Sequence, residues 1–401
     1  MKKQLATLIV SILFLGVIHG QSILSFGISP TNSPEVNKNN LQKAIDGLSA
    51  KGGVIYIDPT ETPYPISGGI ILKKNVSLVG VNAATPRGTA HPTKPQPVGS
   101  VFEITDKKNV FITVESATQI KGIQFWYSKQ THNDPSKIIA YPATIKLSET
   151  STQGVTLNNL TFYGEYLAID FKAHPGLISE LLTVEHCYGY PLSGIFIQID
   201  YCYDIPRILH CHVNPAIRRA FLGRNSNAII DAVIAKKTFA YSIEHTDNAQ
   251  LMDVFTFGTY GGIKLGGESY GQLTNFNFDC VTVGIHKLGN NSFNRNWQIS
   301  QGSIIANAGT SVKDIHPIII EGMGHTSLSN VEAFSGNNPV LTNLGVSYDF
   351  MTVKGNGKTT ISMFGCRMRN YVSKEPITVS NKNAIIQTFG CIDKNEELFE
   401  Y

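Results

Sequence analysis

A polar residue flanked mostly by apolar residues recurs along this chain at a nearly constant interval. The central residues of these segments are Asn159, Thr183, His210, Asp231, Asp253 and Asn275. The last three intervals, from His210 onward, are almost equal, and the two before them are slightly longer. A near-constant period of roughly 22 residues is typical of solenoids, in which each repeat packs only on its neighbours.

A second signal follows the first at a fixed offset of half a repeat. It falls at Asp170, Ser242, Lys264 and His286, each inside a short segment in which apolar and variable residues alternate. Alternation with a period of two is typical of β-strands. Two marks at one period predict a coil of about 22 residues, stacked on its neighbours at the strand spacing of roughly 4.8 Å.

The interval between repeat centres is less regular beyond Asn275. Its best continuations are Ser300-Gln301, Asn330, Met363 and Gln387, and we expect insertions between them to form loops. The segments Phe364-Gly365-Cys366 and Phe389-Gly390-Cys391 are separated by about one repeat, so their two cysteines are expected to stack on adjacent coils.

An open stack of parallel strands needs a cover at its end. Residues 37–51 fit this role, because Leu41, Ala44, Ile45 and Leu48 follow helical spacing and glycines come directly after. We expect this helix to cap the solenoid, and residues 21–401 to form one domain.

Residues 1–20 are predicted to be a secretory signal, since Lys2 and Lys3 precede an apolar run that ends before Gly20. That run is shorter than the ~20 residues of a spanning helix, so stable membrane insertion is not expected. Removal of those two lysines lowers the net charge from +3 to +1, which indicates no broad nucleic-acid surface. Six cysteines are too few for a disulfide framework.

Three segments near the N-terminus carry a resemblance to a known group. They are the helix Asn40–Asp46, the segment Lys51–Pro59 and the segment Tyr64–Ser67. This arrangement resembles the N-terminal signature of pectate-lyase-like proteins related to family 28 glycoside hydrolases. The signature covers roughly Phe26 to Gly80, and the repeats extend it weakly to Cys391. The resemblance implies an all-β, single-stranded right-handed parallel β-helix, in a group that includes lyases, hydrolases and tailspike domains.

In this group, substrates are bound along the outside of the first β-strand of each coil. The side chains expected on that exterior are Asp170, Lys172, Gln198, Asp200, Ser242, Glu244, Lys264 and His286. The turns that follow hold Tyr201, Tyr203, Asp204, Arg224, His245 and Asp247. Acids, bases and aromatic residues are therefore expected to converge on one surface.

Glycoside hydrolysis uses two carboxyl groups roughly 5 to 9.5 Å apart. Glu244 and Asp247 are close in sequence, and Asp200, expected two coils before Glu244 and thus about 10 Å away, is the alternative partner. These three are the predicted catalytic residues, with Asp204 as a further acid. The predicted substrate-binding residues are Tyr201, Tyr203, Asp204, Arg224, His245, Lys264 and His286.

A β-elimination lyase would instead need a base beside a cation that neutralises a uronate. His245, Lys264, Arg218, Arg219 and Arg224 could supply these groups. The sequence also departs from the polygalacturonases, which carry Asn-Thr-Asp, Asp-Asp, Gly-His-Gly and Arg-Ile-Lys motifs. Here Thr246-Asp247 follows His245 and Ile263-Lys264 follows Gly262, which argues against standard pectin hydrolysis.

The leading hypothesis is an exported polysaccharide-degrading enzyme, a hydrolase before a lyase. The alternative is a non-catalytic carbohydrate-binding or surface-adhesion solenoid that uses the same groove. We expect no cofactor and assign no metal ligand, although oxygen ligands for Ca²⁺ scattered over several coils remain open. His210, Asp231 and Asp253 are expected to be structural residues of the polar ladder. The polysaccharide and the oligomeric state are left undetermined.

Overall fold

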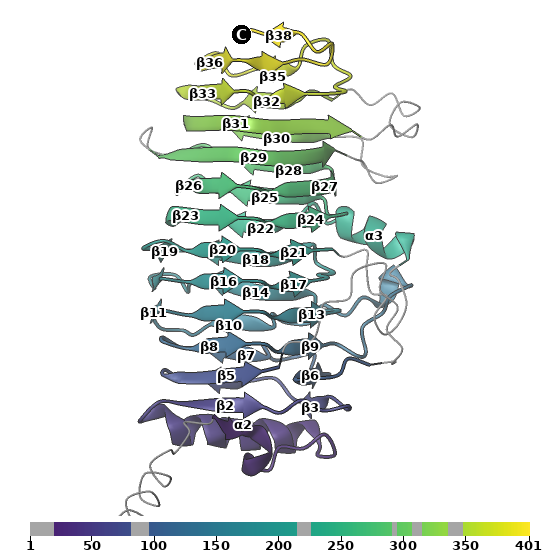
Figure 1. Cartoon of the computed structure of the whole chain (residues 1–401), viewed down its shortest axis with the longest axis vertical. Coiled ribbons are helices and arrows are strands. Elements are labelled where there is room, and N and C mark those ends of the chain that lie inside the picture. The colour runs from purple at the N-terminus through teal and green to yellow at the C-terminus, as the bar shows by residue number, and fades with distance from the viewer. Residues whose placement is uncertain (1–19, 82–95, 215–225, 291–294, 307–314, 336–347) are drawn as a thin grey trace, which may run out of the picture.

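The computed structural model describes residues 20–81, 96–214, 226–290, 295–306, 315–335 and 348–401. The expected signal therefore lies outside the described residues except for Gly20. Parallel strands are stacked in layers from helix α2 at the N-terminal end to β36 near the C-terminus (Figure 1). The expected all-β right-handed parallel β-helix is confirmed, and its right-handed coils agree with the usual hand of parallel crossovers.

One sheet contains 11 strands, one from each successive coil, all paired in parallel. Its strands are β4 Ile70–Leu72, β7 Ile112–Val114, β10 Ile145–Leu147, β14 Leu167–Lys172, β18 Ile195–Asp200, β22 Phe239–Ile243, β25 Gly261–Leu265, β28 Val283–Lys287, β30 His316–Glu321, β32 Met351–Lys354 and β35 Ile377–Val379. Ile197, Tyr241, Ile263 and Ile285 face one another across neighbouring strands and are fully buried. These inward columns form the hydrophobic core.

A second sheet of 27 strands completes each coil. One set of strands follows the 11-stranded sheet along the chain: β2 Gly53–Ile57, β5 Val76–Gly80, β8 Gln119–Lys121, β12 Thr156–Asn158, β16 Thr183–Glu185, β20 Arg207–Leu209, β23 Thr246–Met252, β26 Ser269–Thr274, β29 Asn296–Ala306, β31 Gly324–Ser335, β33 Thr359–Phe364 and β36 Ala384–Phe389. The next set is β3 Tyr64–Ile66, β6 Val101–Ile104, β9 Gln124–Trp126, β13 Thr161–Tyr163, β17 Tyr188–Gly189, β21 His212–Val213, β24 Phe255–Phe257, β27 Asn277–Val281, β34 Arg367–Met368 and β37 Cys391–Ile392. Short strands complete the sheet: β1 Gln21–Ser22, β11 Thr152–Gln153, β15 Ser179–Glu180, β19 Cys202–Tyr203 and β38 Leu398–Phe399.

The two sets of the larger sheet meet at a tight turn that holds one residue with positive φ. We call these residues the turn ladder: Gly122, Asn159, His186, His210, Asp253, Asn275, Gln301, Asn330, Gly365 and Gly390. Backbone N–H groups of the ladder donate to the next coil, as from Asn159 to the Glu185 carbonyl at 2.9 Å and from His210 to the Met252 carbonyl at 2.9 Å. Because the left-handed region is best tolerated by Gly, Asn and Asp, most of the polar repeat follows from the backbone.

Two of the expected repeat centres are wrong. Thr183 lies inside β16, and the ladder member of that coil is His186. Asp231 lies in helix α3, Asn227–Ile234, which Ser226 caps by accepting a hydrogen bond from the Ile229 N–H. The chain from His210 to Asp253 is therefore one long coil, and Asp231 is not a repeat centre although its intervals fit the period.

The C-terminal part of the ladder is also shifted by a few residues. Met363 and Gln387 lie in strands, and Gly365 and Gly390 occupy the turns instead. Gln301 and Asn330 stand where the sequence predicts them.

Helix α2, Pro34–Ser49, covers the N-terminal end beneath β2 as expected (Figure 1). It begins slightly before the predicted start because Ser33 caps it, accepting from the Val36 N–H at 3.3 Å. Its buried face includes Leu41, Ala44 and Ile45.

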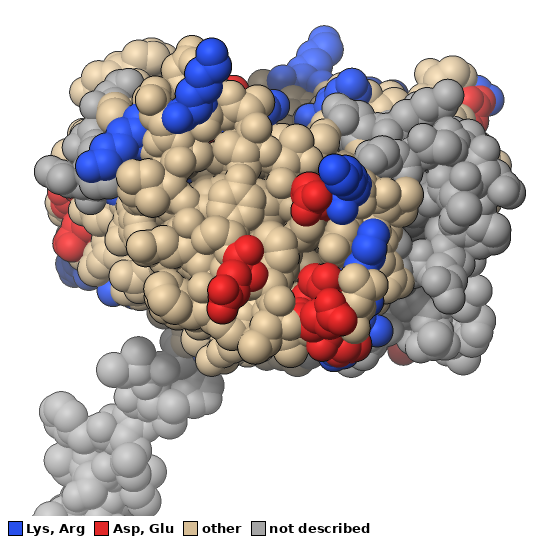
Figure 2. All heavy atoms as spheres, turned by 90° about the horizontal axis from the view of Figure 1, so that it is seen from above, with Lys and Arg blue, Asp and Glu red and all other residues tan. Residues whose placement is uncertain are grey.

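At the C-terminal end, β38 pairs antiparallel with β37. The surface there carries basic and acidic side chains interspersed among uncharged ones (Figure 2). Cys366 and Cys391 are buried on adjacent coils as expected, and both are free thiols. Among the described residues, no helix has the length and apolar character needed to cross a bilayer.

Candidate functional site

The outward side chains of the 11-stranded sheet form columns, because neighbouring strands are paired in register. Gln198 faces Ser242, Ser242 faces Lys264, and Lys264 faces His286. Asp170 precedes them opposite Gln198, whose amide donates to its carboxylate at 2.8 Å. The structure therefore brings together on one face the exterior residues that the repeat predicts.

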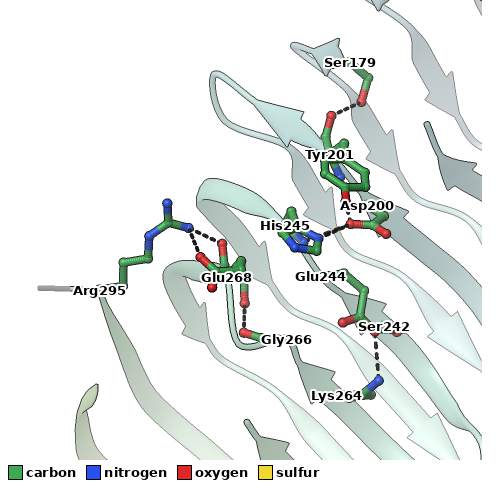
Figure 3. Close-up of polar contacts among 11 residues, drawn as sticks. Ser179, Asp200, Tyr201, Ser242, Glu244, His245, Lys264, Gly266, Glu268 and Arg295 are labelled. Atoms are coloured by element: carbon green, nitrogen blue, oxygen red, sulfur yellow. Dashed lines mark hydrogen bonds and ion pairs between the residues drawn. The ribbon is translucent and has the colours of Figure 1, made fainter. Parts of the chain in front are cut away.

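Asp200 and His245 form a hydrogen-bonded pair at the end of this sheet (Figure 3). The His245 Nδ1 donates to Asp200 Oδ1 at 2.7 Å, and the same oxygen accepts from the backbone N–H groups of His245 and Tyr201 at 3.1 and 3.0 Å. The rings of Tyr201 and His245 stack with centroids 4.5 Å apart and planes at 3°. These contacts orient the imidazole and leave its Nε2 as the nitrogen available for proton transfer.

Glu244 is held by two neighbours on the same face. Its Oε1 accepts from Lys264 Nζ at 2.9 Å and from Ser242 Oγ at 3.0 Å. Gly266 leaves room for the carboxylate, because a Cβ at that position would lie 2.6 Å from Glu244 Oε2 and 2.7 Å from its Cα. The lysine charge compensates the carboxylate charge at a position of limited solvent access.

The two carboxylates lie on neighbouring coils. Ile199 is paired with Ile243, and the Glu244 N–H donates to the Ile199 carbonyl at 2.9 Å, so Asp200 stands opposite Glu244. The expected separation of two coils is therefore wrong, because the segment around Asp231 is a helix and adds no coil. Their backbones are about 4.8 Å apart, the spacing of adjacent strands. Each side chain is only 19% exposed.

Asp247 lies in a different sheet from this pair. It belongs to β23 in the 27-stranded sheet, beyond the fully buried Thr246, whereas Glu244 directly follows β22 in the 11-stranded sheet. A corner of the coil therefore separates the two acids that the sequence placed closest together.

Of the remaining predicted residues, Tyr203 and Asp204 belong to the described part of the chain and Arg224 does not. Tyr203 ends the short strand β19 opposite Glu180, and Asp204 follows with a positive φ of 50°. Arg224, like Arg218 and Arg219, lies outside the described residues.

His286 forms a second polar cluster farther along the same face. Its Nε2 lies 2.8 Å from Glu321 Oε2, and Lys354 Nζ lies 3.7 Å from the same oxygen. Burial lowers the pKa of His286, and the hydrogen bond with Glu321 offsets only part of this effect. Burial alone would raise the pKa of Glu321, but the hydrogen bond from His286 and the charge of Lys354 hold it below its ordinary value.

Sequence reasoning missed Glu321 and Lys354, which stand on the outward face of β30 and β32. Their strands do alternate, but the coils here are longer than the repeat inferred from the sequence, so the offset from the ladder gave no signal. It also missed Arg295, whose Nη1 lies 3.6 Å from Glu268 Oε2 at the margin of the site (Figure 3).

No family model matches this chain, and no curated protein matches it in sequence. Solved structures do match. The DFA-IIIase from Arthrobacter chlorophenolicus A6 without its lid has a TM-score of 0.61 at 11% identity, with 93% of each chain covered. PfbA, a surface adhesin of Streptococcus pneumoniae, has a TM-score of 0.54 at 12% identity, covering 93% of this chain and 91% of that one.

A mutant tailspike protein of E. coli bacteriophage HK620, solved in complex with a hexasaccharide, is also similar. Its TM-score is 0.59 at 12% identity, and the match covers 92% of this chain and 65% of the tailspike chain. At these identities the likeness concerns the parallel β-helix fold alone.

Proposed function

We propose that this chain is an exported polysaccharide-degrading enzyme, a glycoside hydrolase, that works on the outward face of the 11-stranded sheet. The observation that carries the proposal is the pair of largely buried carboxylates, Asp200 and Glu244, on adjacent coils. Each is bound to a different nitrogen base, His245 or Lys264. Most glycoside hydrolases use one carboxylic acid as proton donor and a second carboxylate as base or nucleophile. Here His245, held by Asp200, takes the place of the proton-donating acid beside the Glu244 carboxylate.

Glu244 is the carboxylate that activates water or attacks the anomeric carbon. Lys264 and Ser242 hold its Oε1, which fixes the direction of the side chain. Its second oxygen, Oε2, is the one beside Gly266. A carboxylate positioned in this way loses little conformational freedom when the reaction begins.

His245 is the proton donor to the leaving oxygen, and Asp200 is the group that positions it. Asp200 accepts the Nδ1–H and fixes the direction of the imidazole, while Tyr201 stacks on the ring. Donation from Nε2 breaks the C–O bond without leaving an alkoxide. This assignment changes the expected role of His245 from substrate binding to catalysis, and it gives Asp247 no part in the chemistry.

Carbohydrate as the ligand class is supported by the matching folds. The tailspike was solved with a hexasaccharide, and a mutant of the DFA-IIIase was solved with DFA-III. Tyr201, stacked on His245 beside the carboxylates, offers an aromatic surface of the kind that sugar rings pack against.

A lyase is the second candidate, and the Asp200–His245 pair favours it too. With Nε2 unprotonated, the same histidine would remove the proton beside a uronate carboxyl group, and Lys264 would neutralise that carboxyl group. The two reactions therefore differ in the starting protonation of one imidazole.

The deciding experiment incubates purified protein with a panel of neutral and uronate-containing polysaccharides. New reducing ends without the ultraviolet absorbance of unsaturated products indicate hydrolysis, and reducing ends with that absorbance indicate β-elimination. Glu244→Gln should abolish turnover. Glu332→Gln is the matched control, because Glu332 is also a partly buried carboxylate in an ion pair, 2.7 Å from Arg369 in a different sheet.

We expect Glu332→Gln to cleave at the wild-type rate. Binding of a polysaccharide without any product would support the non-catalytic carbohydrate-binding or adhesion alternative. Equal turnover by wild type and Glu244→Gln would show that the carboxylate pair is not the active site.

A further inference from the structure

A group of imidazole and carboxylate side chains gathers at the turn ladder, away from the 11-stranded sheet. His186 and His210 occupy ladder positions on consecutive coils, and their rings stack with centroids 4.7 Å apart. Glu185, the last residue of β16, places its Oε1 3.4 Å from His186 Nδ1. One ligand atom from each of these three residues lies within 4.8 Å of the other two.

We infer that Glu185, His186 and His210 bind one divalent transition-metal ion of the Zn²⁺ type. With metal–ligand bonds of about 2.0 to 2.1 Å, tetrahedral coordination needs ligand atoms roughly 3.3 Å apart. The Glu185 and His186 atoms already have this spacing. The other ligand atoms must close from at most 4.8 Å, a small rotation for side chains that are all partly exposed.

Hydrogen bonds from outside the three ligands support this geometry. Asp253 Oδ2 lies 2.8 Å from His210 Nδ1, a carboxylate–imidazole pair that fixes the ring and leaves Nε2 as the nitrogen that would bind the metal ion. Asn158 donates to Glu185 Oε2 at 3.1 Å, which leaves Oε1 facing His186. Carboxylate–histidine pairs of this kind are common around metal-bound histidines, and the ladder provides one in register.

The ligand types select the class of metal. Two imidazole nitrogens and one carboxylate oxygen suit Zn²⁺, Co²⁺, Ni²⁺ or Cu²⁺, whereas Ca²⁺ and Mg²⁺ prefer sites made of oxygen. This site differs from the Ca²⁺ ligation that the sequence left open. It lies on a separate face from Asp200 and Glu244, so it is independent of the proposed reaction.

The turn ladder alone does not account for these residues. The ladder requires a positive φ, which Asn159 and Asn275 satisfy in nearby coils with a short polar side chain. Histidine at two consecutive positions, with a glutamate beside one and an aspartate beside the other, adds ligands that the backbone does not need. A binding role explains their coincidence.

The test is titration of purified, chelator-treated protein with ZnCl₂ by calorimetry, with Co²⁺ absorption spectra as a second readout. We expect one ion per chain. In the double variant His186→Asn/His210→Asn, affinity should fall by at least 100-fold. Asparagine is the right replacement because it stands at this ladder position in nearby coils, so the fold is retained. Asp253→Asn should weaken binding by about tenfold.

His174→Asn is the control, since His174 is an exposed histidine outside the ladder, and it should bind as the wild type does. Excess CaCl₂ should not displace Zn²⁺. No binding of Zn²⁺ by the wild type, or undiminished binding by the folded double variant, would overturn the inference.

Discussion

The outward face of the 11-stranded sheet and the turn ladder both repeat one position per coil, but they restrict that position differently. Ladder residues from Asn159 to Asn330 have φ between 50° and 58°, a region that few residue types accept. The sheet positions have ordinary extended backbone, and Gln198, Ser242 and Lys264 succeed one another there. Regularity in the ladder is therefore a property of the backbone, whereas the composition of the sheet face is free to serve binding or chemistry.

This difference sets how a buried polar residue should be interpreted. Asn275 in the ladder needs no explanation beyond its turn. Asp200 and Glu244 on the sheet have no such requirement, and burying their charges costs free energy unless each is paired. The absence of a backbone reason is what makes the sheet acids candidates for function.

Apart from the loss of turnover in Glu244→Gln, the largest expected effect is the fall in kcat of Asp200→Asn. Without the carboxylate, His245 loses the partner that holds its Nδ1 and fixes its orientation. We expect kcat to fall by about 1,000-fold, within the range for loss of general acid catalysis. The assay is the initial rate on the substrate identified from the polysaccharide panel.

The matched ladder substitution is Asn275→Gly, which keeps the positive φ accessible. It should leave kcat unchanged. A loss of less than tenfold for Asp200→Asn, or an equal loss for both variants, would contradict the distinction between the two regions.

Lys287 is a charged residue on the inward face of the same 11-stranded sheet. It follows the outward His286, is fully buried, and donates to the Met323 carbonyl at 3.1 Å. Burial lowers its pKa from 10.5 to about 8. Below pH 8 both the folded and unfolded states carry the charge, so the full cost of burial applies. Between pH 8 and 10.5 the unfolded state binds more protons, so stability from this group rises with pH.

Lys287→Met should therefore be more stable than the wild type at pH 7, by up to about 3 kcal/mol, and this advantage should shrink toward pH 10.5. Chemical denaturation of both proteins at each pH measures the difference in their free energy of unfolding. Groups that both proteins share titrate alike in both, so their contribution to this difference cancels. A constant difference across this range would show that Lys287 does not carry a buried charge.

The smallest expected effect is the loss of stability when Gly365 or Gly390 of the turn ladder is replaced by alanine. Both have positive φ, 59° and 61°, so alanine at either position should cost about 1 to 2 kcal/mol. A Cβ at 365 would lie 2.7 Å from Asn330 Oδ1, whereas a Cβ at 390 meets no atom within 4 Å. Gly365→Ala should therefore be the more destabilising, by roughly 1 kcal/mol. Thermal unfolding of the two variants measures this order, and a reversed order would show that the contact with Asn330 adds no cost to the strained backbone.

Much of the fold was predictable because its signals are local. The capping helix follows from Leu41, Ala44 and Ile45 at helical spacing, and the stacked coils follow from Asp253, Asn275 and the strands at a fixed offset beyond them. Local sequence signals do not show how many coils a long insertion contains. The stretch between His210 and Asp253 looks like two coils in sequence, and α3 makes it one.

Counting the stretch around Asp231 as an extra coil changed which acids the sequence predicted to be neighbours in the candidate site. The sequence supplied the outward position of Asp200, Glu244, Lys264 and His286, because alternation within a strand requires no knowledge of the neighbouring coil. It did not reveal that Asp200 and Glu244 are adjacent, or that Asp247 lies around a corner in the other sheet.

The amino-acid pattern by itself determined the solenoid, its cap and which side of each strand faces outward, since these depend on residues close together in the chain. Only the tertiary structure decided which coils are neighbours, and so which charges meet: Asp200 with His245, Glu244 with Lys264, and His210 with Asp253. The physical reason is that a turn can absorb many residues without changing the strand spacing. Distance along the chain therefore does not measure distance along the stack.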